Sequence, residues 1–524
     1  MSLADRAEAV GTTVSVPDPR LTNEDLAPAG TRKWKVFDLF ALWMSDVHNL
    51  GNYTFAAGLL VLGMNVWQIF TSLLVGFVLI YVGMNLMGRV GQRHGVPFPV
   101  VSRISFGIWG ANVPALIRAV IAIMWYGIQT YLASVAVNVM LLAAIPDLAS
   151  WTEHSFLGLD ALGWTSFLVL WVVQALIISR GMESVRKFQD FCGPAIWLVM
   201  IVLAVWILSK AGWTISLTST PHPVSTGEQF RQWFGAIGLI LATYGTLMLN
   251  FCDFSRFAPD YRTVKRGNFW GLPINSTAFV IVSVIVTAGS IEVFGEAITD
   301  PALLVAKVGN TWVLVLGALT FAIATMGVNI VANFVSPAYD LANVWPQKIT
   351  FRIGGMISTV AALLVTPWNL YSNPDVVNYF LGGLGAFLGP LFGVIIVDYY
   401  WVKRGRVDVD QLFDARPESR YYYRKGFNPK ALWAFLPTAL VAAMFALVPY
   451  FGAIAPYSWF IGTVAAAALY SALCRGERAQ AVADETQAVA DETQAVADET
   501  QAVADKTQAV ADKTQAVADK TAEA

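Results

Sequence analysis

The chain has 524 residues, of which 56% are apolar and only 13% are charged. An ordinary soluble domain carries about 25% charged residues, so this composition excludes a typical soluble enzyme. The 34 Lys and Arg residues against 36 Asp and Glu residues give a net charge of −2, which leaves no basic field to attract nucleic acid. The chain is therefore predicted to be an integral membrane protein.

The predicted elements begin with a polar arm, residues 1–33, that ends in basic residues. The apolar stretch after it is too long for a cleaved signal peptide, so we expect a membrane helix there. A helix that crosses ~30 Å of hydrocarbon needs about 20 mostly apolar residues. Residues 34–475 are predicted to hold twelve such spans, which are 36–61, 66–88, 113–145, 162–179, 188–209, 231–252, 268–294, 311–335, 352–367, 376–401, 431–450 and 456–474.

Basic residues alternate between the connecting loops. Lys and Arg accumulate on the cytoplasmic side of short loops. The loops after spans 2, 4, 6, 8 and 10 are basic, whereas the stretches 146–161, 368–375 and 451–458 contain no Lys or Arg. This alternation predicts that both termini are cytoplasmic, in a multi-pass protein of the inner or plasma membrane.

The last segment, residues 476–524, contains six seven-residue units, three QAVADET and three QAVADKT. A coiled coil needs large apolar residues at two positions of each heptad, and each unit here offers one Val and two Ala. We favour a solvated, partly helical cytoplasmic tail over an oligomerising coil, and we expect a monomeric transport unit.

Two spans carry signs of an interruption. Span 1 places a run of polar or flexible residues at its centre, and a single Asp facing lipid there would cost about 2.5 to 3.5 kcal/mol. Span 6 has a central glycine, Gly245, with Asn250 and Asp253 near one end. Interrupted helices at corresponding positions of two halves are typical of inverted-repeat transporters, in which substrate and ions bind at the breaks. A five-plus-five repeat with two added helices would use all twelve spans.

Spans 3 and 8 carry amides at helical spacing. Trp125 and Gln129 lie four residues apart and share one helix face, as do Asn329 and Asn333. An aromatic plane beside primary amides suits a flat heterocycle, because the ring stacks and the amides donate and accept hydrogen bonds. The alternative is that Gln129, Asn329 and Asn333 only bond neighbouring helices.

At this point the sequence resembles the nucleobase:cation symporter-1 family, which carries purines, pyrimidines, allantoin and hydantoins. The resemblance implies an all-α membrane protein of twelve helices with the LeuT-type five-plus-five inverted repeat plus two helices. It rests on NEDLAP at 23–28, WMSDVHN at 43–49, GVPFPVVSRISFG at 95–107, WYGIQTY at 125–131, NFCDFSRFAPDY at 250–261, NIVANFVSPAYD at 329–340 and LGPLFGVIIVDYYWVKR at 388–404.

The resemblance also implies roles for single residues. Trp125 matches the stacking tryptophan, Gln129 and Asn333 match substrate-binding amides, and Leu381 aligns with a gate residue. Asn49 falls at the polar position of broken helix 1. Tyr244 replaces a second tryptophan of the hydantoin carriers, which favours a small ring such as uracil or another pyrimidine, with allantoin as the alternative.

The positions that match the family's sodium site bear on the driving ion. In sodium-coupled members, carbonyls of helices 1 and 8 and two hydroxyls of helix 8 hold the ion. The carbonyl positions match Ser45, His48 and Ala324, but the hydroxyl positions match Gly327 and Val328. A hard cation would lose two of five oxygens, so sodium is disfavoured.

The same region offers proton carriers, because Asp46 and His48 lie within one turn of the expected site. Proton coupling is therefore favoured over sodium. The alternative is that His48 is a neutral, hydrogen-bonded histidine and that Asp46 pairs with a basic residue near the helix end.

We expect a secondary symporter that imports a small heterocycle with a cation and has no cofactor, no metal site and no nucleic-acid partner. Its surroundings are membrane lipid. A channel or a non-transporting sensor is the alternative of another class, although no filter sequence is visible. A membrane enzyme is disfavoured because the chain lacks HExxH, GxSxG, P-loop and dinucleotide motifs.

Overall fold

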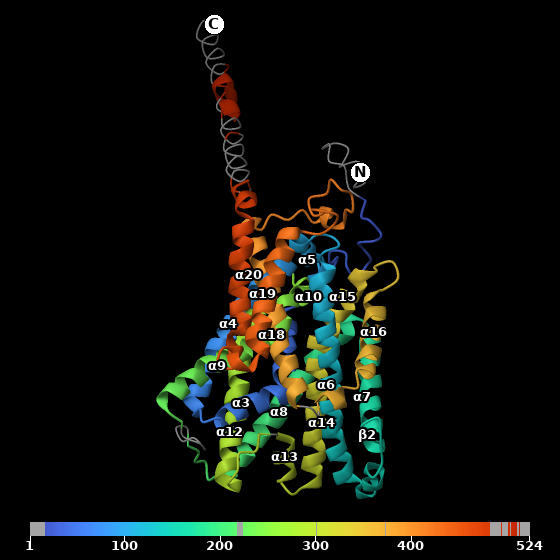
Figure 1. The fold of residues 1–524 in the computed structure, drawn as a ribbon, viewed down its shortest axis with the longest axis vertical. Coiled ribbons are helices and arrows are strands. Elements are labelled where there is room, and N and C mark those ends of the chain that lie inside the picture. Colours follow the sequence, from blue (N-terminus) through green and yellow to red (C-terminus); the bar gives the residue numbers. More distant parts are fainter. Residues whose placement is uncertain are drawn as a thin grey trace, which may run out of the picture.

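The computed structural model describes residues 16–216, 224–299, 301–371 and 374–480, and in the tail residues 482, 494, 501–503, 505–510 and 513. Helices dominate it and run largely along one axis (Figure 1). The described tail residues beyond 480 are helical and exposed.

Helices cover every predicted span. In chain order they are α2 (Val36–Val47) with α3 (Leu50–Val61), α4 (Val66–His94), α6 (Asn112–Ala144), α7 (Ala161–Ser179), α8 (Met182–Lys210), α9 (Thr226–Asn250), α11 (Tyr261–Phe269) with α12 (Thr277–Phe294), α14 (Thr311–Val328) with α15 (Val335–Val344), α16 (Phe351–Leu364), α18 (Pro374–Val397), α19 (Pro429–Leu447) and α20 (Ser458–Leu473). Among the described residues, eight helices are long and apolar enough to cross a membrane, so twelve crossings stay a prediction.

Shorter elements connect these helices. The short α-helices are α5 (Phe98–Phe106), α10 (Cys252–Ser255), α13 (Pro301–Ala306) and α17 (Pro367–Tyr371). Three π-helical segments, η2 (Trp270–Ser276), η3 (Asn329–Phe334) and η4 (Asp398–Val402), widen long helices, and 3₁₀ turns form η1 (Pro146–Thr152), η5 (Asp410–Phe413), η6 (Pro449–Phe451) and η7 (Ala455–Tyr457). Strands β1 (Ser155–Phe156) and β2 (Leu159–Asp160) pair antiparallel, with Ser155 opposite Asp160.

The span helices pack in two groups. One group contains α6, α7, α14 with α15, and α16, which are spans 3, 4, 8 and 9. The other contains α2 with α3, α4, α9, and α11 with α12, which are spans 1, 2, 6 and 7 (Figure 1). Helix α8 packs between the groups, and α18 packs on α9, α19 and α20. Each group thus pairs spans that are five apart, as an inverted repeat requires.

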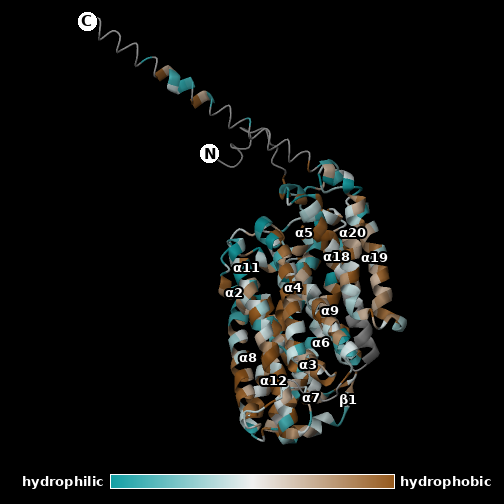
Figure 2. Ribbon diagram, turned by 90° about the vertical axis from the view of Figure 1, so that its left-hand side faces the viewer, coloured by the Kyte–Doolittle hydropathy of each residue, from teal (hydrophilic) through white to brown (hydrophobic). Residues whose placement is uncertain are grey.

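The hydropathy of the surface fits a membrane setting. Hydrophobic residues recur along the helices of the bundle, and hydrophilic residues gather at its ends (Figure 2). Exposed large apolar residues recur along the helices, such as Leu198, Ile201 and Val205 on α8. The three cysteines, Cys192, Cys252 and Cys474, are free and buried.

Helix α9 corrects one expectation from the sequence. It runs without a break from Thr226 to Asn250, straight through Gly245, and the ladder is interrupted only at Phe251. The glycine serves packing instead: a Cβ added at Gly245 would lie 2.7 Å from the indole nitrogen of Trp459 on α20. Glycine in this membrane helix therefore marks a close helix contact, and the prediction of a central break in span 6 is wrong.

The N-terminal arm crosses one end of the bundle, which we call the arm end; α5 and α10 lie there, and α13 and β2 lie at the opposite end (Figure 1). Asn23 donates its amide to the carbonyls of Pro346 and Ile349, both at 3.1 Å. Arg256 donates to the carbonyls of Asp25 and Ala27 at 2.9 and 2.5 Å. The arm therefore bonds the loop between α15 and α16 and the segment after α10 at once.

Candidate substrate and cation site

The first span is broken between α2 and α3. Asn49 caps α3, because its Oδ1 accepts from the Asn52 backbone N–H at 3.0 Å and its Nδ2 donates to the Asp46 carbonyl at 2.5 Å. The Asn49 N–H donates to the Val47 carbonyl, so it does not make the usual helical bond to the Ser45 carbonyl. The predicted interruption of span 1 is present, and polar side chains from within the segment stabilise it.

Helix α14 lies against this break. A Cβ added at Gly327 would lie 3.6 Å from both the carbonyl oxygen and the Cβ of Ser45. The eighth span, which begins with α14, and the broken first span therefore meet where the family resemblance placed a cation. Gly327, which faces Ser45, carries no side-chain oxygen, and neither does the next residue, Val328. The Ser45 hydroxyl donates to the Gln189 carbonyl at 3.1 Å.

His48 is packed in an aromatic setting. Its ring lies 4.7 Å from that of Phe279 at an interplanar angle of 28°, and 4.9 Å from that of Trp197 at 80°. Its Nε2 is 3.0 Å from the Asn275 side-chain oxygen, which also accepts from the Trp197 indole at 2.8 Å. This setting is that of a hydrogen-bonded core histidine, which was the alternative reading of the sequence.

Asp46, unlike His48, has no hydrogen-bond partner for its side chain among the described residues. Its side chain is buried, and its carboxylate makes no hydrogen bond or ion pair with any residue that the structure describes. Arg186 on α8 instead bonds Asp38, at 2.7 Å. An unpaired buried carboxylate is costly, which makes Asp46 the residue of the break that best fits a proton carrier.

Tyr244 brings α9 to the break. Its hydroxyl accepts from the Asn52 amide at 3.0 Å, and that amide also donates to the Val47 carbonyl at 2.9 Å. Because the hydroxyl accepts from Asn52, its own proton is left to point elsewhere. Tyr244 thus brings one hydrogen-bond donor to the break between α2 and α3.

Trp125 and Gln129 lie on α6, as expected. Trp125 is half-buried and packs against the main hydrophobic core. Gln129 is 9% exposed, and its amide makes no hydrogen bond with the described residues. A nearly buried amide without a partner loses hydrogen bonds that water would supply, so this position is suited to a ligand.

The two asparagines of η3 differ in how many of their hydrogen-bonding atoms have partners in the protein. Asn329 donates to the Tyr126 carbonyl at 3.1 Å, the Thr130 hydroxyl at 3.0 Å and the Gln174 side-chain oxygen at 2.8 Å. Its own oxygen accepts from the Asn333 amide at 3.1 Å. Asn329 is thus occupied by the protein, whereas the Asn333 oxygen has no hydrogen-bond partner among the described residues.

Helix α14 and η3 join the two sides of the candidate site. Gly327 contacts the break at Ser45, and Asn329, two residues on, contacts α6. Ala324 is buried on the same helix. The gate position Leu381 lies in α18, but its side chain lies outside the described residues.

The sequence reasoning missed several residues of this region. Gln174 on α7 bonds the Thr130 hydroxyl at 3.2 Å and completes the network around Asn329. Asn275 in η2 holds His48 and Trp197. Gln174 is a single amide within an apolar span, and that isolation was a signal that could have marked it. Asn275 shares its span with Asn268, Ser276 and Thr277, so its sequence surroundings did not single it out.

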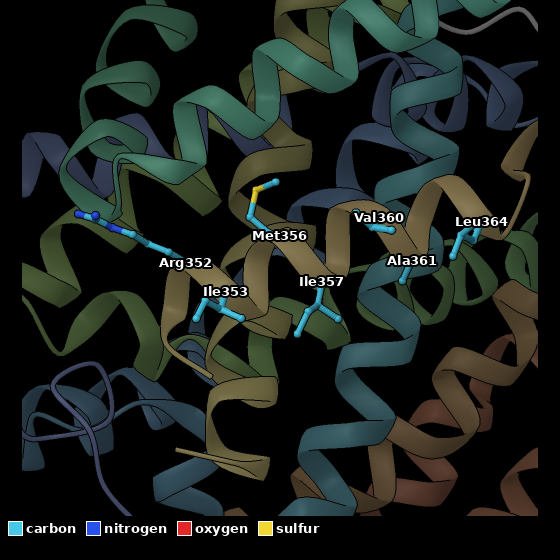
Figure 3. Close-up of a pocket in the computed structure, with 7 residues that line it drawn as sticks. All are labelled: Arg352, Ile353, Met356, Ile357, Val360, Ala361 and Leu364. Atoms are coloured by element: carbon cyan, nitrogen blue, oxygen red, sulfur yellow. The ribbon is translucent and has the colours of Figure 1, made fainter. Parts of the chain in front are cut away.

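The structure has a cavity along α16 that is unsuited to the substrate. This cavity of about 540 Å³ is open along α16, and Figure 3 shows that its lining side chains come from this one helix. Apart from Arg352 these are aliphatic or Met side chains without amide or hydroxyl groups, so they cannot orient a polar ring. The surface is instead suited to lipid tails.

The two helix groups, the broken first span and the polar lining define a multi-pass membrane transporter of the LeuT type. The fold is like that of Mhp1, a nucleobase-cation-symport-1 family transporter solved in a closed conformation with bromovinylhydantoin bound, at a TM-score of 0.73 and 22% identity over 88% of this chain and 96% of that one. It is also like that of MhsT in complex with L-phenylalanine, at a TM-score of 0.54 and 13% identity over 84% and 99% of the two chains.

The family described as "permease for cytosine/purines, uracil, thiamine, allantoin" matches residues 27–462. The chain is 37% identical to the allantoin permease of Bacillus subtilis over 89% of this chain and 96% of that protein. It is 33% identical to the purine-uracil permease NCS1 of Arabidopsis thaliana over 83% and 72% of the two chains. The chain therefore belongs to the nucleobase:cation symporter-1 family, so it is a permease that uses a co-transported cation and not an enzyme.

Proposed function

We propose that the protein imports a small heterocycle with a ureide edge, allantoin or a pyrimidine such as uracil, across the plasma membrane together with a proton. The observation that carries the proposal is the unpartnered Gln129 amide, one turn from Trp125. A ureide presents N–H and C=O groups side by side in one plane. The Gln129 amide and the Asn333 oxygen would bind that edge while Trp125 stacks on the ring.

Among these substrates we place allantoin ahead of uracil, although the sequence alone favoured a pyrimidine. The likeness to the Bacillus subtilis allantoin permease extends over nearly the full length of both chains. Tyr244 supplies a hydroxyl donor where the hydantoin carriers have a tryptophan. Allantoin carries a ureido group outside its ring, and that group would accept this hydrogen bond.

Uptake and competition test the substrate. In a host that lacks its own permeases, we expect saturable uptake of labelled allantoin. Unlabelled uracil and thymine should compete weakly, and purines should not compete. If purines alone competed, the proposal of a ureide substrate would be wrong.

The proposed proton coupling rests on two features of the break between α2 and α3: few ligands for sodium and an unpartnered carboxylate. Gly327 on α14, which faces Ser45, offers no hydroxyl, and neither does its neighbour Val328, which weakens a sodium site. Asp46 offers a buried carboxylate with no partner among the described residues. A group of this kind can take up a proton from one side of the membrane and release it on the other.

Imposed gradients separate the two ions. In membrane vesicles we expect an inward proton gradient to drive accumulation and a protonophore to abolish it. A sodium gradient at fixed pH should have no effect. Acceleration by sodium at fixed pH would contradict proton coupling.

The proposed arrangement has three parts: a cytoplasmic arm (residues 1–33), a transporter domain (34–475) that works as a monomer, and a heptad-repeat tail (476–524). The basic loops support placing the arm end in the cytoplasm. Deleting residues 480–524 should leave uptake unchanged, and labelling of cysteines introduced at both termini should require permeabilised cells.

A further inference from the structure

A polar cavity of about 500 Å³ lies at the arm end, between the last turn of α4 and the loop after η4. Neither the substrate nor the cation site uses it. Its lining contains three arginines from two distant parts of the chain, and the residues are Arg93, His94, Gly405, Arg406, Val407, Asp408 and Arg420.

The three arginines are exposed, and none has a carboxylate within ion-pair distance among the described residues. Other basic side chains of this loop are paired: Lys403 bonds Asp398 at 2.6 Å, and Arg416 bonds Asp414 at 2.7 Å. Unlike Lys403 and Arg416, the arginines of the cavity therefore keep positive charge that no described carboxylate neutralises.

The carboxylate in the lining does not cancel this charge. Asp408 accepts from the Gln411 side-chain amide at 2.9 Å and from the Gln411 N–H at 3.4 Å. Among the described residues, no ion pair joins Asp408 to an arginine of the cavity. Three guanidinium groups against one carboxylate leave a net charge of about +2 at neutral pH.

The backbone brings these guanidinium groups together. Gly405 has φ +73°, and its N–H donates to the Tyr399 carbonyl at 2.7 Å. A Cβ added at Gly405 would lie 3.3 Å from an Arg93 guanidinium nitrogen. A turn in the left-handed region, with no side chain at this point, thus lets Arg93 lie against the segment that carries Arg406.

We propose that this cavity binds a phosphate group, carried either by an anionic phospholipid or by a free phosphate compound. Guanidinium groups match phosphate oxygens with paired, charge-assisted hydrogen bonds. A free phosphate compound offers at least three unesterified oxygens and a phospholipid headgroup phosphate offers two, and each of these oxygens can accept from a guanidinium group. The cavity lies at the end of membrane helices, where headgroup phosphates lie and basic pockets bind them.

The test uses the full-length protein and a matched pair of variants. Arg406→Gln/Arg420→Gln removes two charges from the cavity. Arg424→Gln/Lys425→Gln removes two charges from exposed residues of the same loop that do not line it. Native mass spectrometry measures retention of phosphatidylglycerol against phosphatidylcholine, and thermal unfolding in detergent is followed during titration with inorganic phosphate.

We expect the wild type and the loop control to retain phosphatidylglycerol, and the cavity variant to bind it about tenfold more weakly or worse, because two charge-assisted bonds are lost. Stabilisation by inorganic phosphate as well would identify free phosphate compounds as a source, and retention of the lipid alone would identify the headgroup. The proposal is overturned if the wild type binds neither probe, if the cavity variant binds like the wild type, or if the control loses binding equally.

Discussion

Two polar regions inside the bundle differ in whether their side chains have hydrogen-bond partners. In the network of Thr130, Gln174 and Asn329, the amide of Asn329 has three acceptors from α6 and α7. At the break between α2 and α3, the Asp46 carboxylate has no bonded partner among the described residues. The difference teaches that a polar residue in a membrane helix indicates function only when its hydrogen-bonding capacity is left over.

The largest effect is expected at the break. Asp46→Asn should reduce concentrative uptake to the level of cells without the protein, because the proposed proton carrier is lost, while exchange of labelled for unlabelled substrate across the membrane continues. Asp38→Asn is the matched control, since Asp38 lies on the same helix but pairs with Arg186. Full accumulation by the Asp46 variant would show that the unpartnered carboxylate is not the proton carrier.

In the network, Asn329→Ala should act on stability. It leaves acceptors of α6 and α7 without their donor, which costs about 1 to 3 kcal/mol for a buried group. We expect a lower unfolding temperature in detergent and less protein in the membrane. The surviving protein should keep its Michaelis constant, and a raised constant with unchanged stability would show that Asn329 binds substrate directly.

Gln129→Ala should have the reverse effect: a raised Michaelis constant and unchanged stability. The Gln129 amide has no described partner to lose, so the unfolding temperature should stay near that of the wild type. Loss of one or two hydrogen bonds to the substrate should raise the Michaelis constant about tenfold. A stability loss equal to that of Asn329→Ala would place Gln129 in the structural network.

Gly245→Ala tests the continuous helix α9. The added methyl group would press on the Trp459 indole, at 2.7 Å, and should destabilise by about 1 kcal/mol while leaving substrate affinity unchanged. Gly235→Ala on the same helix is the control, because a Cβ there meets nothing within 4 Å. A changed Michaelis constant for Gly245→Ala alone would indicate that α9 opens at this glycine during transport.

The smallest effect is expected in the loop outside the bundle. The Arg416 guanidinium lowers the pKa of Asp414 from its usual range. A carboxyl with a lowered pKa stabilises the fold above its unfolded pKa of about 3.9, and this stabilisation is lost as the pH falls through the folded pKa. Arg416→Gln should therefore lower the unfolding temperature slightly at neutral pH, where this stabilisation is fully present, and leave it unchanged below the folded pKa, where the stabilisation is already lost. An equal loss at both pH values would contradict this.

The sequence predicted those features that depend on local composition. Seven polar or flexible residues in one span could not all face lipid, and the break at His48 and Asn49 is the result. Gly245 misled because a glycine in a membrane helix permits either a break or a close contact, and only the position of Trp459 distinguishes the two. Pairing across helices was also invisible, so the engagement of Asn329 by Gln174 could not be foreseen.

The arm that crosses the bundle has a practical consequence. Its hydrogen bonds to the α15–α16 loop and to Arg256 tie together elements that belong to different helix groups. Any movement that separates the groups at this end must stretch or break those bonds. An affinity tag or truncation that displaces residues 23–27 would therefore alter the energetics of opening, and reporter fusions are better attached after residue 480.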